Sequence, residues 1–187
     1  MRNFFIISLF ALITTACIQE KTGCAILPGG GQYCLQSASV VVPFEAQQKV
    51  EVNFKGHHET MITELEIDAK GINFAGFTPF GQKLMQVSYD NQKVSGLASP
   101  DKHLNPALLL ALLQLSLWPA DVARAGLSES VVLREAAGNR YITHNGRLIM
   151  QVQYADNTLP YRALIITLPT IDMTLAIASL PEDEVTP

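Results

Sequence analysis

No hydrophobic run in the sequence is long enough to cross a lipid bilayer, because a spanning helix needs about 20 consecutive apolar residues. The chain also has little excess charge, with 13 lysines and arginines against 17 aspartates and glutamates. Since it has no basic patch, nucleic acid is not an expected partner. The sequence contains no metal-ligand spacing, activated-nucleophile motif, phosphate loop or dinucleotide fingerprint. We therefore expect a protein that is not an enzyme and holds neither a metal nor a cofactor.

The beginning of the chain has the pattern of a secretory signal peptide, with one positive charge before a short apolar stretch at 4–16. The residues Thr14-Thr15-Ala16-Cys17 that end this stretch resemble the lipobox of bacterial lipoproteins. In that family the cysteine receives a diacylglycerol, the chain is cut before it, and the new amine is acylated. The resemblance implies a signal peptide at 1–16 and a lipidated Cys17, with enough acyl chains for stable anchoring. Ordinary secretion with a free Cys17 is the alternative.

The residue that follows the lipobox cysteine implies a location. In enterobacterial lipoproteins an aspartate directly after the cysteine retains the protein at the inner membrane. Here Ile18 follows Cys17. The resemblance therefore implies a lipid anchor in the outer membrane, on its periplasmic face.

Two further cysteines, Cys24 and Cys34, flank a turn-forming stretch at 27–31 that contains three consecutive glycines. Because the periplasm is oxidising, we expect these cysteines to form a disulfide that contributes about 3 kcal/mol. A metal site is the competing interpretation, but it lacks a nearby histidine pair. We interpret residues 17–46 as a lipidated tether that carries this disulfide loop.

From residue 47 to 180 the sequence has the pattern of an antiparallel β protein with one helical insertion. Apolar and polar residues alternate, as in Val50, Val52 and Phe54, and turn signals such as Asn145-Gly146 separate the alternating segments. Strands joined by short links pair as an antiparallel meander. The expected strands are 47–55, 61–68, 72–74, 82–89, 92–97, 131–135, 140–143, 148–154, 162–168 and 172–178.

The helical insertion is unusually apolar. Asn105 is a good N-cap, Pro106 suits the first turn, and 107–118 contains almost no polar residue. A helix that is apolar nearly all round must be surrounded by apolar residues, and a twisted sheet provides a concave face to cover. We expect a mainly β fold, an antiparallel half-open β-barrel covered by this leucine-rich helix, with a second short helix at 121–126 and a flexible tail at 181–187.

Two segments, Thr78-Pro79-Phe80-Gly81-Gln82-Lys83-Leu84 and Leu113-Gln114-Leu115-Ser116-Leu117-Trp118-Pro119-Ala120, resemble an uncharacterised family of Gram-negative lipoproteins. Genes of that family often lie beside aryl-polyene biosynthesis genes. The order of elements is more distantly similar to the lipoprotein-localisation factors LolA and LolB, half-barrels that hold acyl chains under helices. LolB has a Pro-Leu-Gly loop whose protruding leucine helps to deliver cargo into the membrane, and Phe80 stands in the place of that leucine. The proposed tether and the more apolar helix depart from LolB.

The resemblance implies a carrier or acceptor for hydrophobic acyl cargo, either an aryl-polyene lipid or a lipoprotein, with a periplasmic carrier protein as a further partner. We predict a loop that contacts a membrane or a partner, formed by Phe77, Pro79, Phe80 and Gly81. We predict a lipid cavity lined by Met85, Val87, Leu109, Leu112, Leu113, Trp118, Met150 and Val152.

Two alternatives remain open at this point. The loop aromatics could lie under the domain, and the leucine-rich helix could be an ordinary packed core. In the second case the protein would be a structural or scaffold lipoprotein of an export or biosynthetic complex, with no cavity.

Overall fold

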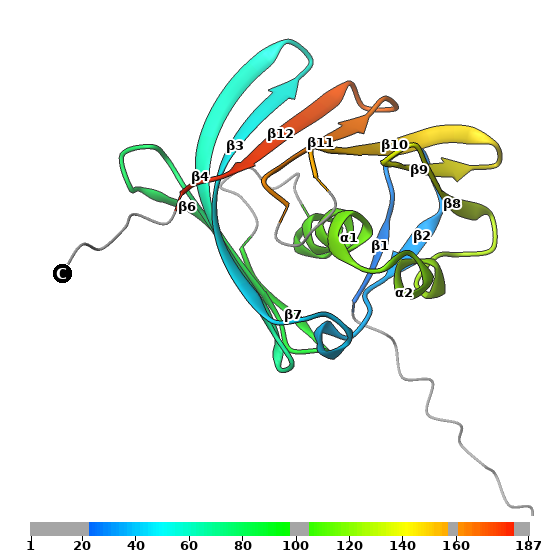
Figure 1. The fold of residues 1–187 in the computed structure, drawn as a ribbon, viewed down its shortest axis with the longest axis horizontal. Coiled ribbons are helices and arrows are strands. Elements are labelled where there is room, and N and C mark those ends of the chain that lie inside the picture. Colours follow the sequence, from blue (N-terminus) through cyan, green and yellow to red (C-terminus); the bar gives the residue numbers. More distant parts are fainter. Residues whose placement is uncertain (1–22, 98–104, 157–160, 182–187) are drawn as a thin grey trace, which may run out of the picture.

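The computed structural model describes residues 23–97, 105–156 and 161–181. Ten antiparallel strands form one curved sheet around a single long helix (Figure 1). The strands of this sheet are β3 (Phe44–Phe54), β4 (His57–Asp68), β5 (Gly71–Phe77), β6 (Lys83–Tyr89), β7 (Val94–Leu97), β8 (Val131–Ala136), β9 (Asn139–His144), β10 (Arg147–Tyr154), β11 (Ala163–Leu168) and β12 (Met173–Ser179). The other elements are β1 (Cys24–Ile26), β2 (Gln32–Cys34), the 3-10 turn η1 (Ala38–Val40), α1 (Pro106–Leu117) and α2 (Ala120–Ala125).

The sheet consists of two meanders, one of β3 to β7 and one of β8 to β12, which are joined by the pairing of β3 with β12. Its order is β7-β6-β5-β4-β3-β12-β11-β10-β9-β8, so the first and last strands of the set pair with each other in the middle. Strands β7 and β8 precede and follow the helical insertion, and they lie at opposite edges. Since these two edges do not pair, the sheet is open, as expected for a half-open barrel (Figure 1). All ten expected strands are present, although the pairing of β3 with β12 was not predicted.

The tight hairpin turns have the local chemistry that their backbone requires. Asn145 and Gly146 both have positive φ, 49° and 79°, as a type I′ turn demands. Lys55 and Gly56 form a second such pair, with φ of 51° and 82°. These two turns set the registers of β9 with β10 and of β3 with β4.

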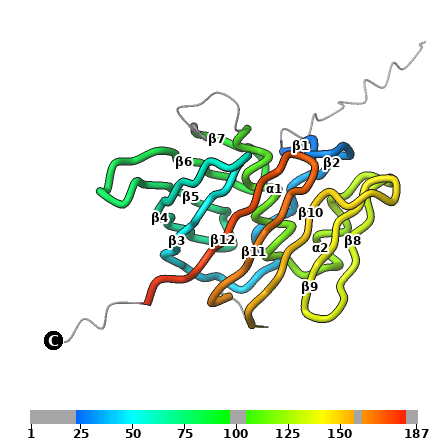
Figure 2. Tube along the Cα trace, turned by 90° about the horizontal axis from the view of Figure 1, so that it is seen from above, coloured from blue at the N-terminus to red at the C-terminus, as the bar shows by residue number. Residues whose placement is uncertain are grey.

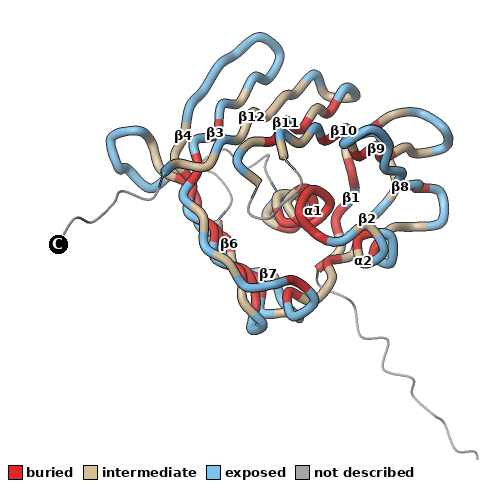
Figure 3. Tube along the Cα trace, in the orientation of Figure 1, coloured by how far each residue is buried: buried red, intermediate tan, exposed pale blue. Residues whose placement is uncertain are grey.

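Helix α1 begins and ends where the sequence predicted, because its ends are capped locally. The Asn105 side chain accepts a hydrogen bond from the Ala107 amide at 2.9 Å, and Pro106 occupies the first turn. At the other end, Trp118 is extended and Pro119 follows. The helix lies inside the concave face of the sheet, where most of its residues are buried (Figure 3).

The interpretation of residues 17–46 as a tether is wrong for the part that the structure describes. Cys24 and Cys34 do form the predicted disulfide, but β1 and β2 pack beside α1 instead of leading away from the domain (Figure 2). Tyr33 and Ala25 are buried in the main core, and β3 already begins at Phe44. The hairpin packs against the domain because its alternate residues are apolar and lose their contact with water when they cover the helix.

Several predictions concern residues outside the described ranges, namely the signal peptide at 1–16, the lipidated Cys17 and residues 182–187 of the expected tail. In the described part of the chain, no helix has both the length and the apolar character that a membrane span needs. Within the same residues, no group of three or more histidine, cysteine, aspartate or glutamate side chains is placed to hold a metal ion.

Candidate functional site

The concave face of the sheet is covered unevenly. Toward both edges its inward side chains are buried, including Ile142 and Val152 on one side and Val87 on the other. In the centre, Met61 and Ile177 are the direct cross-strand partners of buried Val50, so all three point to the same face. Met61 and Ile177 nevertheless remain partly exposed. The least covered part of the interior is therefore its centre, at β3, β4 and β12.

The exposure of this central strip increases toward the β3–β4 turn. Val52 and Leu175 form the next inward pair and are partly exposed, and Phe54, the last residue of β3, is 37% exposed. The Lys55 ammonium lies 5.1 Å from the centre of the Phe54 ring. Met173 pairs with Phe54 and completes the strip. We call Val52, Phe54, Met61, Met173, Leu175 and Ile177 the central strip.

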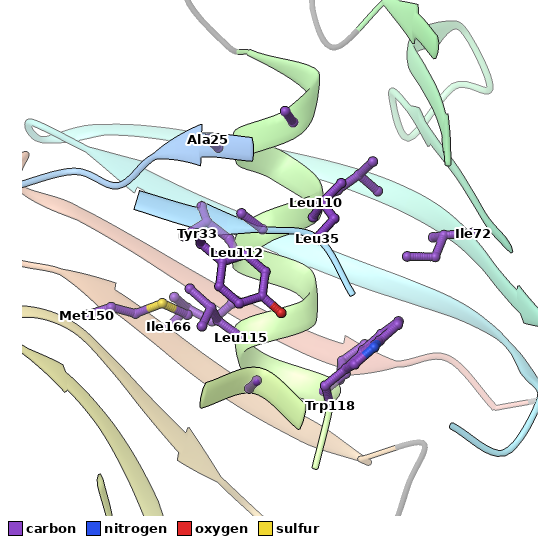
Figure 4. Packing of buried hydrophobic residues seen from close by; sticks show 14 of the residues in the cluster. Ala25, Tyr33, Leu35, Ile72, Leu110, Leu112, Leu115, Trp118, Met150 and Ile166 are labelled. Atoms are coloured by element: carbon purple, nitrogen blue, oxygen red, sulfur yellow. The ribbon is translucent and has the colours of Figure 1, made fainter. Parts of the chain in front are cut away.

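Helix α1 offers a second partly exposed apolar surface. Leu109 and Leu113 are one turn apart and partly exposed, although both contact the core. The other side of the helix is buried, as Leu110 and Leu115 illustrate (Figure 4). The helix and the central strip thus present incompletely covered apolar side chains within one curved sheet.

Gln114 attaches the disulfide-linked hairpin to α1. Its side-chain oxygen accepts hydrogen bonds from the Tyr33 hydroxyl at 3.1 Å and from the Gln36 amide at 2.8 Å, and its NH₂ group donates to the Gln36 carbonyl at 2.8 Å. Trp118 adds a bond from its indole N–H to the Ser37 carbonyl. Burial raises the pKa of the Tyr33 phenol, which keeps the hydroxyl protonated as a donor. A polar residue within an apolar run was the only sequence signal for this contact.

Arg140 and Tyr154 hold the same C-terminal end of α1 from the side of the sheet. The Arg140 guanidinium, on a residue only 4% exposed, donates to the carbonyls of Leu115 and Trp118 at 2.7 and 2.9 Å. The Tyr154 hydroxyl donates to the Ser116 carbonyl at 2.6 Å, and burial raises the pKa of this phenol. Carbonyls at a helix C-terminus lack partners within the helix, and a cation there also complements the helix dipole. The sequence places both residues in expected strands, and strand alternation does not indicate a contact of either residue with α1.

The eight residues predicted to line a cavity divide into two groups. Six are buried in the main core, namely Met85, Val87, Leu112, Trp118, Met150 and Val152. Leu109 and Leu113 alone among the eight retain some exposed surface. Contact of any of the eight residues with a ligand stays a prediction. None of the eight belongs to the central strip.

The predicted contact loop lies between β5 and β6, with Phe80 98% exposed at its tip. The Thr78 amide donates to the Gln82 carbonyl at 2.8 Å, and the Gly81 amide donates to the Thr78 carbonyl at 2.9 Å. Gly81 has a φ of 81°, which glycine adopts without strain. The alternative that both aromatics lie under the domain is thus wrong for Phe80, whereas Phe77 is partly buried at the end of β5.

An open groove of about 460 Å³ lies elsewhere, along edge strand β8. Its walls include Arg124 and Leu127, and the Arg124 Nε–H donates to the Leu133 carbonyl at 3.2 Å. None of the residues predicted to line a cavity contributes to this groove. It therefore does not correspond to the predicted lipid site.

Comparison with known proteins identifies a family and several similar solved structures. The model of the family described as protein of unknown function DUF3261 matches residues 45–181, which begins at the second residue of β3 and includes the rest of the ten-stranded sheet. No curated protein matches the chain. A crystal structure of a Vibrio parahaemolyticus domain, proposed to be an outer membrane lipoprotein-sorting protein, is similar with a TM-score of 0.39 and 9% identity. The similarity covers 73% of this chain and 83% of that one.

Proposed function

The chain belongs to the DUF3261 family, whose function is unknown, and from its geometry we propose that it binds the acyl chain of a lipid or lipoprotein. The observation that carries this proposal is the central strip, where inward apolar side chains stay partly exposed although the flanking parts of the same face are buried. Leaving apolar side chains hydrated inside a fold forgoes favourable burial. A ligand that covers them would supply that burial.

An alkyl chain has the chemistry that fits the strip. Burial of each methylene contributes about 0.8 kcal/mol, so ten buried carbons would contribute about 8 kcal/mol before the cost of ordering the ligand. Met61 and Met173 are flexible and polarizable, and such side chains adapt to a flexible ligand. Binding of this kind needs no cofactor and no catalytic step.

We further propose the setting in which this binding occurs. A lipidated Cys17 would anchor the protein at the periplasmic face of the outer membrane, where it would accept or pass on cargo. The resemblance of segments 78–84 and 113–120 to lipoproteins encoded beside aryl-polyene genes favours an aryl-polyene lipid as one cargo. A lipoprotein delivered by a periplasmic carrier is the other.

A scaffold without a ligand is the second candidate, and one observation favours it. Leu110, Leu115 and Trp118 are completely buried, so much of the interior is already filled by the protein itself (Figure 4). Under this proposal the protein would organise an export or synthesis complex through its exposed Phe80 loop.

Lipid extraction and mass spectrometry distinguish these functions when applied to protein expressed without residues 1–17, which carries no acyl chain of its own. We expect a co-purifying lipid, or saturable binding of a fluorescent fatty acid if the lipid is lost during purification. Protein that is free of lipid and does not bind the fluorescent fatty acid would leave the scaffold as the function.

Replacing Phe80 with glutamate should separate ligand binding from delivery. Because Phe80 is 98% exposed, Phe80→Glu should leave the midpoint of thermal unfolding unchanged and leave bound lipid in place. Transfer of a labelled lipid to vesicles of phosphatidylethanolamine and phosphatidylglycerol should slow by about tenfold, since insertion of a phenyl ring contributes about 1.5–3 kcal/mol. Val42→Glu is the matched control, because Val42 is also apolar and 79% exposed. Equal transfer rates for the two variants would show that this loop has no specific role in delivery.

A further inference from the structure

Two polar side chains point into the concave face beside the central strip. Gln48 and Thr63 are direct cross-strand partners on β3 and β4, and they are 8% and 0% exposed. Their neighbours Gln47, Lys49 and Glu64 are exposed, so the alternation of the strands places Gln48 and Thr63 on the inner face. Val50 and Met61 are the next inward pair, which places the two polar residues at the buried end of the strip.

The hydrogen bonding of this pair is incomplete. The Thr63 hydroxyl lies 3.5 Å from the Gln48 carbonyl, at the outer limit for a hydrogen bond. In the part of the chain that the structure describes, the side-chain amide of Gln48 has no hydrogen-bond partner. Gln48 is 8% exposed and its amide atoms are not among the completely buried atoms that lack a partner, so the amide keeps a small contact with solvent. A ligand that displaces this solvent must supply the hydrogen bonds that the amide loses. The position therefore carries a donor and an acceptor that the fold itself does not use.

The inward residues next to the pair on β3, β4 and β12 are uncharged. The adjacent inward residues on β3 and β4 are Ala46, Val50, Met61 and Leu65. Ser179 lies opposite Gln48 on β12, and its hydroxyl is already bonded to the Tyr161 carbonyl at 3.0 Å. A carboxylate bound here would lose its hydration without gaining an opposite charge, which is unfavourable. A neutral group that accepts a hydrogen bond fits better.

We propose that Gln48 selects the ligand by donating hydrogen bonds to a neutral carbonyl, the ester or amide that joins an acyl chain to the rest of a lipid. This inference rests on the proposed function, because it names the polar part of the ligand whose chain covers the central strip. The Gln48 NH₂ group is the donor, and the alkyl chain extends from it toward Val52 and Phe54. The preferred ligands are therefore acylated lipids, rather than free hydrocarbons or fatty-acid anions.

A matched pair of probes tests this selection. Glycerol 1-monolaurate and 1-O-dodecylglycerol have the same head group and the same chain length, but only the ester has a carbonyl. In competition with a fluorescent fatty acid, the unchanged protein should bind the ester about tenfold more tightly than the ether, since a site with unsatisfied polar groups discriminates against a ligand lacking the partner. In Gln48→Met, which keeps the length of the side chain, the affinity for the ester should fall to that for the ether.

One control and a second variant separate this result from a change in the fold. Gln47→Met alters the exposed neighbour on the same strand and should preserve the tenfold preference. Gln48→Leu also removes the amide and should abolish the preference, which provides a second variant if Gln48→Met does not fold. Equal binding of the two probes by the unchanged protein would overturn the selection but leave acyl binding intact. Failure of both probes to bind would overturn acyl binding and the selection together.

Discussion

Arg140→Met should lower the free energy of unfolding by about 3–5 kcal/mol, the range found when one partner of a buried charged contact is removed. Methionine fills a similar volume but cannot donate hydrogen bonds to the Leu115 and Trp118 carbonyls at the end of α1. Each buried acceptor left without a partner costs about 1–3 kcal/mol. Most of the loss should arise at the helix end, because the other partner, Glu135, has a side chain 48% exposed and stays hydrated.

Urea unfolding followed by the fluorescence of Trp118, the single tryptophan, measures this loss. Arg134→Met provides the control, since it makes the same change at an exposed position on the neighbouring strand and should shift stability by less than about 0.5 kcal/mol. Arg140→Lys should be intermediate, because a lysine can reach only part of the same set of acceptors. Similar stability of Arg140→Met and Arg134→Met would contradict the assignment of Arg140 as the cap of α1.

Met61→Glu should weaken binding of a fluorescent fatty acid by about 100-fold, equivalent to roughly 2.7 kcal/mol. Met61 is partly exposed on the central strip, so a carboxylate there stays hydrated while the site is empty. A bound alkyl chain would displace that water, and an unpaired charge against an apolar ligand is strongly unfavourable. The penalty should therefore appear in ligand binding more than in folding.

Ile62→Glu is a closely matched control, because Ile62 is the next residue, is also partly exposed, and lies on the outer face of the same strand. It should retain the affinity of the unchanged protein, and its unfolding midpoint should show what a glutamate costs at this level of the sheet. Titration of both variants with the same probe gives the comparison. If the two substitutions weaken binding equally, the ligand does not lie on the central strip.

The C-terminal end of α1 illustrates how polar contacts stabilise an otherwise apolar interior. Gln114 and Trp118 connect the helix to the disulfide-linked hairpin, while Arg140 and Tyr154 bind its last carbonyls from the sheet. These bonds fix the position of the helix within the sheet. They thereby leave Leu109 and Leu113 at a defined place, partly exposed and available to a ligand.

The sequence by itself determined the elements whose causes are local. The ten strands follow from alternation with a period of two. The turn at Asn145-Gly146 follows because these two residue types tolerate the positive φ angles of a type I′ turn. The limits of α1 follow from Asn105 and the prolines at 106 and 119. The disulfide followed from two cysteines that flank a glycine-rich turn. The sequence placed Phe80 in a loop but left open whether its ring lies under the domain, and the structure shows that it is 98% exposed.

Only the tertiary structure decided which of these elements meet. The pairing of β3 with β12 joins residues near opposite ends of the chain, and no periodicity encodes such a partner. In the same way, Gln114, Arg140 and Gln48 could be interpreted only as interruptions of apolar patterns until their partners, or the lack of one, were visible. The physical reason is that periodicity reports which face of an element is buried, whereas the completeness of that burial depends on segments distant in sequence. The partly covered centre of the sheet is such a property.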